Sequence, residues 1–247
     1  MAVRAVRVGR WVQQPTKPVS ATTFYYSCNN QVIVASKLKL AEFDEGHRQA
    51  LLTARFNENR ELVFGVTGWR SAWVGAGEEK AVYLIIDAQN RAFALEVLAK
   101  ASYLDGKLTE GHYFADLHVP GIANVRWDKQ SLFGHIFSGE VKAREFIYGD
   151  TLAGPGLRTK LVKPVNPLKR LIGGFCKFWA HSVVIPRYEA VRRTYRDAHE
   201  ANVMVELLPI SNPERKKHYL FPILWLEDDC RLHLRYFRLT PIDVRLR

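Results

Sequence analysis

The sequence has little cysteine and no long apolar run. Its three cysteines, Cys28, Cys176 and Cys230, are far apart and form no CxxC pair, which argues against a disulfide framework and a zinc ribbon. No apolar stretch approaches the roughly 18–20 residues that span a bilayer, and the N-terminus lacks the continuous apolar stretch of a signal peptide. We therefore expect a cytoplasmic protein with buried free thiols and no membrane association.

The common motifs of cofactor and nucleotide sites are also missing. The chain has no GxGxxG after a strand, no GxxxxGK[ST], no GxSxG and no HExxH. Gly154-Pro155-Gly156 has the glycines of a phosphate loop without the Lys-Ser/Thr pair that follows them. The histidines show neither HxH nor HxxxH spacing, although His112 and His118 flank Asp116. We therefore expect no cofactor and no metal, and the sequence assigns no catalytic residue.

The composition is that of a folded protein with many short strands. Apolar residues make up 47% and charged residues 25% of the 247 residues, which is typical of globular chains. Turn residues and β-formers predict an α+β fold with mixed or antiparallel sheets and a few short helices, with a ferredoxin-like fold as one form of it. Strands are expected at 3–12, 22–27, 32–35, 62–66, 81–86, 112–119, 123–127, 133–137, 141–148, 202–208, 218–226 and 231–238. Helices are expected within 40–56 and 186–201, loops at 14–21 and 68–77, and 91–103 fits either helix or strand.

Charge divides the chain into two regions. Residues 1–140 carry 16 basic and 14 acidic side chains, whereas residues 141–247 carry 20 and 11. Residues 1–148 therefore form a strand-rich region of near-neutral charge, and 149–247 a basic α+β region that is either a second domain or part of one compact unit. The Gly- and Pro-rich segment 149–174 between them is a linker or an ordered basic loop.

The basic charge is concentrated in residues 158–196, which hold ten Lys or Arg and a single acid, Glu189. Such a field attracts phosphate backbones or anionic membranes, and no helix with a broad apolar face supports the membrane alternative. Arg192 and Arg196, four apart on the expected helix, would share a face, and Phe175, Phe178 and Trp179 could stack on bases. The predicted nucleic-acid-binding residues are Arg158, Lys160, Lys163, Lys169, Arg170, Lys177, Trp179, Arg192, Arg193 and Arg196.

Two further patterns bear on function. In the expected strand 231–238, Arg231, His233 and Arg235 alternate with leucines, which predicts either a basic sheet face for RNA or an ordinary solvated face. Asp87, Glu96 and Lys100 follow an apolar strand in the order of a metal-dependent nuclease, although the gap from Glu96 to Lys100 is four residues where one is usual. For metal-free RNA cleavage, His47 or His181 would be the general base.

One segment resembles a known family. Ile185-Pro186-Arg187-Tyr188 through Arg192-Arg193, with the strands after it and the turn 211–215, is similar to the arginine-rich helix and closing strands of CRISPR RNA-processing proteins of the Cas6 or Cas5 type. The resemblance implies a ferredoxin-like fold and a guide-RNA hairpin as ligand. It covers at most a quarter of the chain, the family's glycine-rich C-terminal loop is absent, and no catalytic histidine can be matched.

These observations predict a nucleic-acid-binding protein, for RNA or a single strand, that acts within a larger ribonucleoprotein or defence-type complex. Two alternatives are open at this point. An assembly protein would dock its basic half on an acidic protein partner, and a nuclease would cleave the nucleic acid that it binds.

Overall fold

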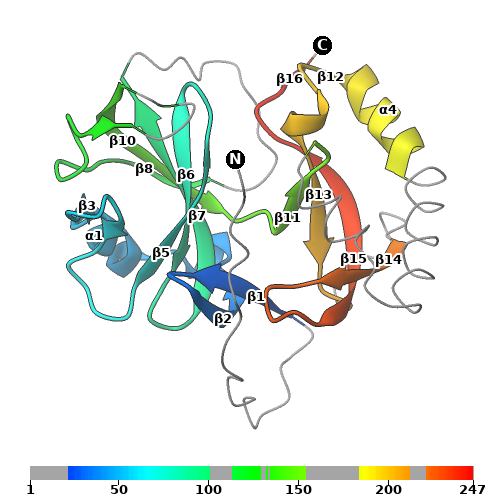
Figure 1. The fold of residues 1–247 in the computed structure, drawn as a ribbon, viewed down its shortest axis with the longest axis horizontal. Helices are drawn as coiled ribbons and strands as arrows, with labels where there is room; N and C mark the ends of the chain where they lie inside the picture. The colour runs from blue at the N-terminus through cyan, green and yellow to red at the C-terminus, as the bar shows by residue number, and fades with distance from the viewer. Residues whose placement is uncertain are drawn as a thin grey trace, which may run out of the picture.

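The computed structural model of the chain describes residues 22–100, 113–128, 132, 134–153, 184–211 and 221–246. These residues form two sheets that lie side by side, joined at one end by the first hairpin (Figure 1). The α+β class predicted from sequence is confirmed, with strands in the majority. Among the described residues, no helix is both long enough and apolar enough to cross a membrane.

The larger sheet has eight strands. Its path is β1-β2-β7-β10-β8, with β5 and β6 on the other edge of β7 and β9 beside β10. All pairings are antiparallel except β2–β7. The strands are β1 (Thr23–Cys28), β2 (Gln31–Lys37), β5 (Arg70–Ala76), β6 (Lys80–Ile86), β7 (Arg91–Ala99), β8 (Tyr113–His118), β9 (Arg126–Trp127) and β10 (His135–Glu145).

The smaller sheet is antiparallel, in the order β11-β13-β15-β14. Its strands are β11 (Gly149–Thr151), β13 (Val203–Leu208), β14 (Phe221–Leu226) and β15 (Leu232–Pro241). Two short ladders complete the strands: β3 (Arg55–Phe56) with β4 (Leu62–Val63), and β12 (Tyr195–Arg196) with β16 (Arg245–Leu246). The helices are α1 (Glu45–Leu52), α4 (Ile185–Thr194) and the 3-10 turns η1 (Leu40–Glu42) and η4 (Glu200–Asn202). The described elements do not show the βαββαβ order of a ferredoxin-like fold.

The first hairpin forms as its sequence predicts. β1 and β2 are joined by Asn29 and Asn30, whose φ angles are 49° and 61°. Asparagine tolerates this left-handed region better than most residues, and two such residues in succession match the twist of a two-residue hairpin turn. The turn therefore fixes the register that places Phe24, Tyr26 and Cys28 on the buried face of β1.

Three local expectations were wrong. The segment 68–77 is not a loop, because Arg70–Ala76 pairs with β6 and only shifts register between Trp73 and Gly75. The strands expected at 133–137 and 141–148 are one strand, β10, interrupted by a bulge between Phe137 and Val141 where Gly139 has φ 91°. The helix expected over 186–201 ends at Thr194. In the first two cases glycine marks a bulge within a strand rather than its end.

The ambiguous segment 91–103 contains a strand, β7, over Arg91–Ala99. It pairs with β6 on one edge and with β10 and β2 on the other, and both of its faces are buried. A strand buried on both faces loses the alternation of apolar and polar residues that reveals a half-buried strand. The sequence pattern therefore could not separate the two possibilities.

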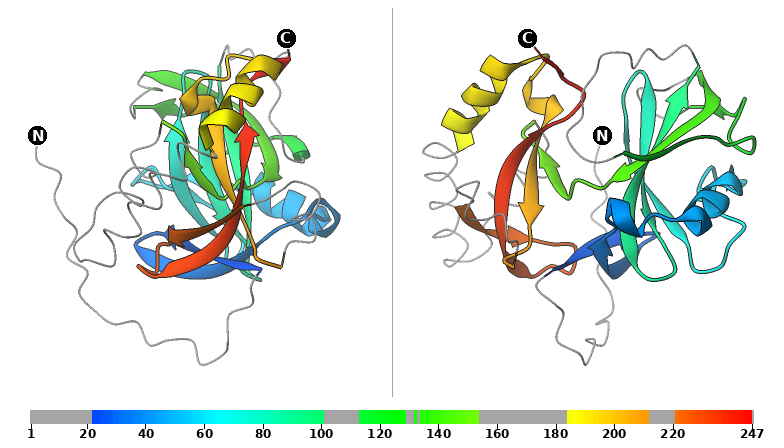
Figure 2. Two further views of the ribbon diagram at one scale, coloured as in Figure 1. Left: turned by 90° about the vertical axis from the view of Figure 1, so that its right-hand side faces the viewer. Right: turned by 180° about the vertical axis from the view of Figure 1, so that it is seen from behind.

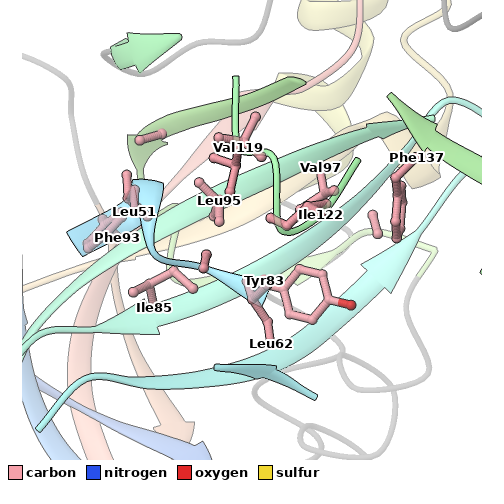
Figure 3. Packing of buried hydrophobic residues seen from close by; sticks show 14 of the residues in the cluster. Leu51, Leu62, Tyr83, Ile85, Phe93, Leu95, Val97, Val119, Ile122 and Phe137 are labelled. Atoms are coloured by element: carbon pink, nitrogen blue, oxygen red, sulfur yellow. The ribbon is translucent and has the colours of Figure 1, made fainter. Parts of the chain in front are cut away.

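The larger sheet is covered on both faces. On one face, Phe93, Leu95 and Val97 of β7 pack with residues of α1, β4 and the turn after β8 (Figure 3). On the other, Leu84, Ile86 and Ala92 pack with residues of the smaller sheet that include Val205, Leu207, Trp225 and Phe237. This second core cluster therefore contains residues from both sides of the charge boundary at 148.

The two sheets are also linked by polar contacts. Glu227 accepts a hydrogen bond from the Tyr25 N–H at 3.0 Å and pairs with Arg235 at 2.6 Å. The Lys37 ammonium, on β2, lies 2.7 Å from Glu206 on β13. Because Glu206 and Glu227 are buried, each of these carboxylates depends on a partner for its charge.

We expect Gly149→Ala to destabilise the protein. Gly149 has φ 150° beside β13, and an added Cβ would collide with the Val205 carbonyl oxygen. Backbone strain together with displacement of β11 should lower the free energy of unfolding by about 2–4 kcal/mol, measured by urea denaturation. Gly75→Ala is the matched control, because a Cβ at Gly75 meets no atom within 4 Å. Equal stability of the two variants would contradict this account.

The Glu206 ion pairs should make stability depend on pH. Burial alone would raise the pKa of Glu206, but Lys37 and Arg238 together lower it from 4.5 to about 2. A depressed folded-state pKa stabilises the protein above pH 4.5, and this contribution is lost as the pH falls toward 2.

Glu206→Gln should therefore lower the free energy of unfolding at pH 7 by about 3 kcal/mol. The difference from wild type should shrink between pH 4.5 and 2, followed by urea denaturation across that range. Glu58→Gln, at an exposed site, should change neither quantity. A Glu206→Gln deficit that stays constant with pH would count against the pairing.

Candidate nucleic-acid interface

Helix α4 carries the described part of the predicted basic surface. It begins at Ile185 with Pro186 in its first turn, a position where the missing N–H of proline costs nothing. Arg192 and Arg193 lie in its last turn, where cations interact favourably with the helix dipole. The chain then turns directly into β12, which pairs with β16. Local sequence thus favours a short helix that ends in arginines.

Arg192, Arg193 and Arg196 are all exposed. None of them forms a salt bridge with any residue that the structure describes. The predicted shared helix face of Arg192 and Arg196 was wrong, because Arg196 lies in β12 and pairs in register with Arg245. The three arginines therefore span the end of the helix and the start of a strand.

A cavity of about 670 Å³ adjoins Arg192. Its lining includes Tyr188, Tyr195, His199 and the carboxylates of Asp197 and Glu200. The Arg192 guanidinium lies 5.8 Å from the centroid of the Tyr188 ring, and the Tyr188 hydroxyl donates to the Ala198 carbonyl at 3.1 Å. An aromatic ring fixed beside a guanidinium can stack on an unpaired base. The two carboxylates would repel a phosphate inside the cavity, so phosphates fit better over Arg193 and Arg196.

Three acidic residues of this half of the chain are engaged away from α4. Glu206 pairs with Lys37 and Arg238, Glu227 with Arg235, and Asp243 with Lys80. These carboxylates are neutralised between or within the sheets, whereas the α4 arginines face solvent. Glu189, Asp197 and Glu200 are exposed on or beside α4, so the surface there carries acidic side chains as well as the three arginines.

The remaining predicted binding residues lie outside the described part of the chain. These are Arg158, Lys160, Lys163, Lys169, Arg170, Lys177 and Trp179, together with the stacking candidates Phe175 and Phe178 and the candidate base His181. Tyr188 and Tyr195 were not singled out from the sequence. The signal for Tyr188 was its position four residues before Arg192, on the same helix face.

The expected basic face of the last strand was wrong. Arg235 on β15 is only 4% exposed, and its guanidinium donates to Glu227 at 2.6 Å and to the Thr23 carbonyl at 2.8 Å. His233 pairs with Asp229 at 2.9 Å, and its ring lies 4.8 Å from the Tyr25 ring in a tilted arrangement. On the opposite face Leu234 is exposed. Period two correctly placed His233 and Arg235 together, but that face packs against β1 rather than against solvent.

The nuclease arrangement is not assembled. Asp87 is buried beside α1, with Arg91 at 2.7 Å and His47 at 3.2 Å, whereas Glu96 lines the space between the sheets. Among the described residues, no three potential metal ligands lie close together. His47 is itself buried, with Asp44 2.6 Å from its Nδ1. His47 and Asp87 are therefore buried and paired with each other rather than exposed to a substrate.

Arg235→Gln tests the structural role of the last strand. The change leaves Glu227 buried without its cation, so the free energy of unfolding should fall by roughly 3–5 kcal/mol, as measured by chemical denaturation. The exposed Arg231 gives the matched control, and Arg231→Gln should leave stability within about 0.5 kcal/mol of wild type. Similar stabilities for the two variants would indicate that Arg235 is a surface residue after all.

The comparisons with known proteins add no family to this description. The chain matches no protein-family model, no curated protein and no solved structure. Any functional argument therefore rests on the residues of this chain.

Proposed function

We propose that this protein binds nucleic acid, as RNA or an unpaired strand, through a surface that includes α4 and β12. The observation that carries the proposal is the exposure of Arg192, Arg193 and Arg196 without a carboxylate partner among the described residues. Exposed cations that lack internal partners are available to displace counterions from phosphates, which is the main source of affinity for a nucleic-acid backbone.

The charge of the surrounding sequence supports the same ligand. Residues 158–196 hold ten basic side chains and one acid, and α4 with the start of β12 is the described end of that segment. Glu206, Glu227 and Asp243, which lie in or next to β13, β14 and β15, form ion pairs inside the protein. A field of one sign over a contiguous stretch suits a polyanion better than a single small anion.

The cavity beside Arg192 favours an unpaired strand over duplex DNA. Tyr188 and Tyr195 line it together with Arg192, and stacking on such rings requires a base that is not already stacked in a duplex. In addition, α4 is followed by β12 rather than by a second helix, so the described elements do not form a helix-turn-helix here. Membership of a larger ribonucleoprotein complex is part of the same proposal.

The direct test neutralises the three arginines. The triple variant Arg192→Gln, Arg193→Gln, Arg196→Gln should bind single-stranded RNA more weakly than wild type. If each arginine contacts one phosphate, the slope of log affinity against log salt should become shallower by about 2. Fluorescence anisotropy between low and moderate salt measures both quantities. Replacement by glutamate at the same positions should weaken binding further.

The matched control removes three exposed arginines from the far side of the larger sheet. The variant Arg55→Gln, Arg60→Gln, Arg126→Gln changes net charge equally, at residues around β3 and β9. Figures 1 and 2 show β3 at the end of the molecule opposite α4. If both triple variants lose the same affinity and the same salt slope, binding is nonspecific and the α4 surface is not the site.

Co-purification separates nucleic acid from a protein partner. The ratio of absorbance at 260 and 280 nm, on protein isolated at low salt, should be high and should fall after RNase treatment. A clean protein spectrum, with no binding to random RNA or single-stranded DNA at low salt, would overturn the proposal and favour an acidic protein partner.

A further inference from the structure

The cavity beside Arg192 carries charges that phosphate binding alone does not account for. Its lining combines two tyrosines, one arginine and one histidine with two carboxylates, Asp197 and Glu200. Both carboxylates are exposed, and neither forms a salt bridge or a side-chain hydrogen bond with a residue that the structure describes. A ligand that enters the cavity can therefore reach them. On a surface that binds a polyanion, accessible carboxylates cost affinity unless they accept hydrogen bonds from the ligand.

The wall that carries Glu200 is held in place by hydrogen bonds from two sides. The Tyr188 hydroxyl on α4 donates to the Ala198 carbonyl at 3.1 Å. The Ala153 N–H, beyond the end of β11, donates to the Glu200 carbonyl at 3.1 Å. The tyrosine ring and the backbone before η4 are thus fixed relative to each other, which lowers the ordering cost of binding a ligand between them.

Arg192 and Glu200 both act on Tyr188. The Arg192 guanidinium lies 5.8 Å from the centroid of the Tyr188 ring. Burial raises the pKa of the Tyr188 hydroxyl, Arg192 lowers it and Glu200 raises it, so both charges lie close enough to affect this group. A planar ligand that stacks on Tyr188 would therefore meet a donor and an acceptor at its edges.

An ionised carboxylate accepts hydrogen bonds and donates none, and this property selects among the four bases. The Watson–Crick edge of guanine places two donors, N1–H and N2–H, side by side. Adenine, cytosine and uracil each place an acceptor beside their donor, and the lone pair of that acceptor would repel the carboxylate. The guanine O6, next to the two donors, is an acceptor of the kind that arginine binds. Guanine is therefore the base that best suits Glu200 and Arg192 together.

We propose that the cavity beside Arg192 holds an unpaired guanine base of the bound strand. The base stacks on Tyr188, and its N1–H and N2–H groups donate to the Glu200 carboxylate. This base site rests on the proposed nucleic-acid function and adds base selectivity to it, because contacts to phosphates carry no sequence information of their own. The phosphates that flank the guanine then lie over Arg193 and Arg196, outside the acidic cavity.

Short uridine oligomers with one central replacement test the base. Fluorescence anisotropy at constant salt would compare strands that carry guanosine, inosine or adenosine at the centre. Guanosine should bind at least about tenfold more tightly than adenosine, which also stacks as a purine; this is the factor typical of one hydrogen bond to a charged group. Inosine keeps N1–H and lacks the amino group at position 2, so its affinity should fall between the two.

One variant and its matched control locate the acceptor. Glu200→Gln should lower the preference for guanosine over adenosine at least about fivefold, because a neutral amide accepts more weakly than a carboxylate. Glu189 is exposed on α4 and does not line the cavity. Glu189→Gln removes the same charge, so both variants should bind the all-uridine strand slightly more tightly, but the control should keep the guanosine preference. Thermal unfolding of both should match wild type, since both sites are exposed.

Two results would overturn the guanine site and leave the α4 surface in place. The first is equal binding of all the strands with the salt dependence of wild type intact. The second is a guanosine preference that Glu200→Gln and Glu189→Gln retain equally, because the base would then be recognised elsewhere. No binding of any strand at low salt would overturn the proposed function, and the guanine site with it.

Discussion

The arrangement of the two sheets depends on how the backbone N–H and C=O groups along the second edge of β1 are hydrogen-bonded. Among the described strands β1 pairs with β2 alone, and its other edge meets side chains of the smaller sheet. Glu227 and Asp228 accept hydrogen bonds from the N–H groups of Tyr25 and Ser27, and Arg235 donates to the Thr23 carbonyl. A buried charge without partners is far more costly than a buried pair. The contacts are therefore all made in one register or most of them are lost, which fixes the second sheet against the first.

This constraint acts at one end of the interface and explains the two kinds of lining between the sheets. Near β1, Phe24, Tyr26 and Trp225 belong to a shared apolar core. Further along β6 and β7 the same face presents Lys80 and Glu96, whose charges exclude close apolar packing. Close-packed interiors tolerate few voids of water size, and the cavity of about 720 Å³ lined by Lys80 and Glu96 lies where these charges interrupt the packing.

Sequence reasoning found the elements that depend on local chemistry and missed what depends on which face is buried. The Asn29-Asn30 turn and the proline at the start of α4 act within a few residues, so the sequence alone predicts the hairpin and the start of the helix. In 231–238 the alternation correctly put His233 and Arg235 on one face, but period two does not say whether that face meets solvent. Phe237 shares that face and is buried, and this was the available signal. Gly75 was read as a loop residue because a bulge is defined by the partner strand.

The same difference between local and tertiary information applies to the charged residues. The arginines of α4 were predictable as a group because charge density along the sequence needs no tertiary information, although their exposure did need it. The buried ion network of Lys80, Glu96 and Arg144 was not predictable, because these residues come from three strands and meet only when the sheet forms. The difference follows from how each charge is satisfied. The buried carboxylates Glu206 and Glu227 are held by cations of neighbouring strands, whereas Arg192, Arg193 and Arg196 are exposed and have no salt bridge to a described residue, which leaves them available to a polyanion.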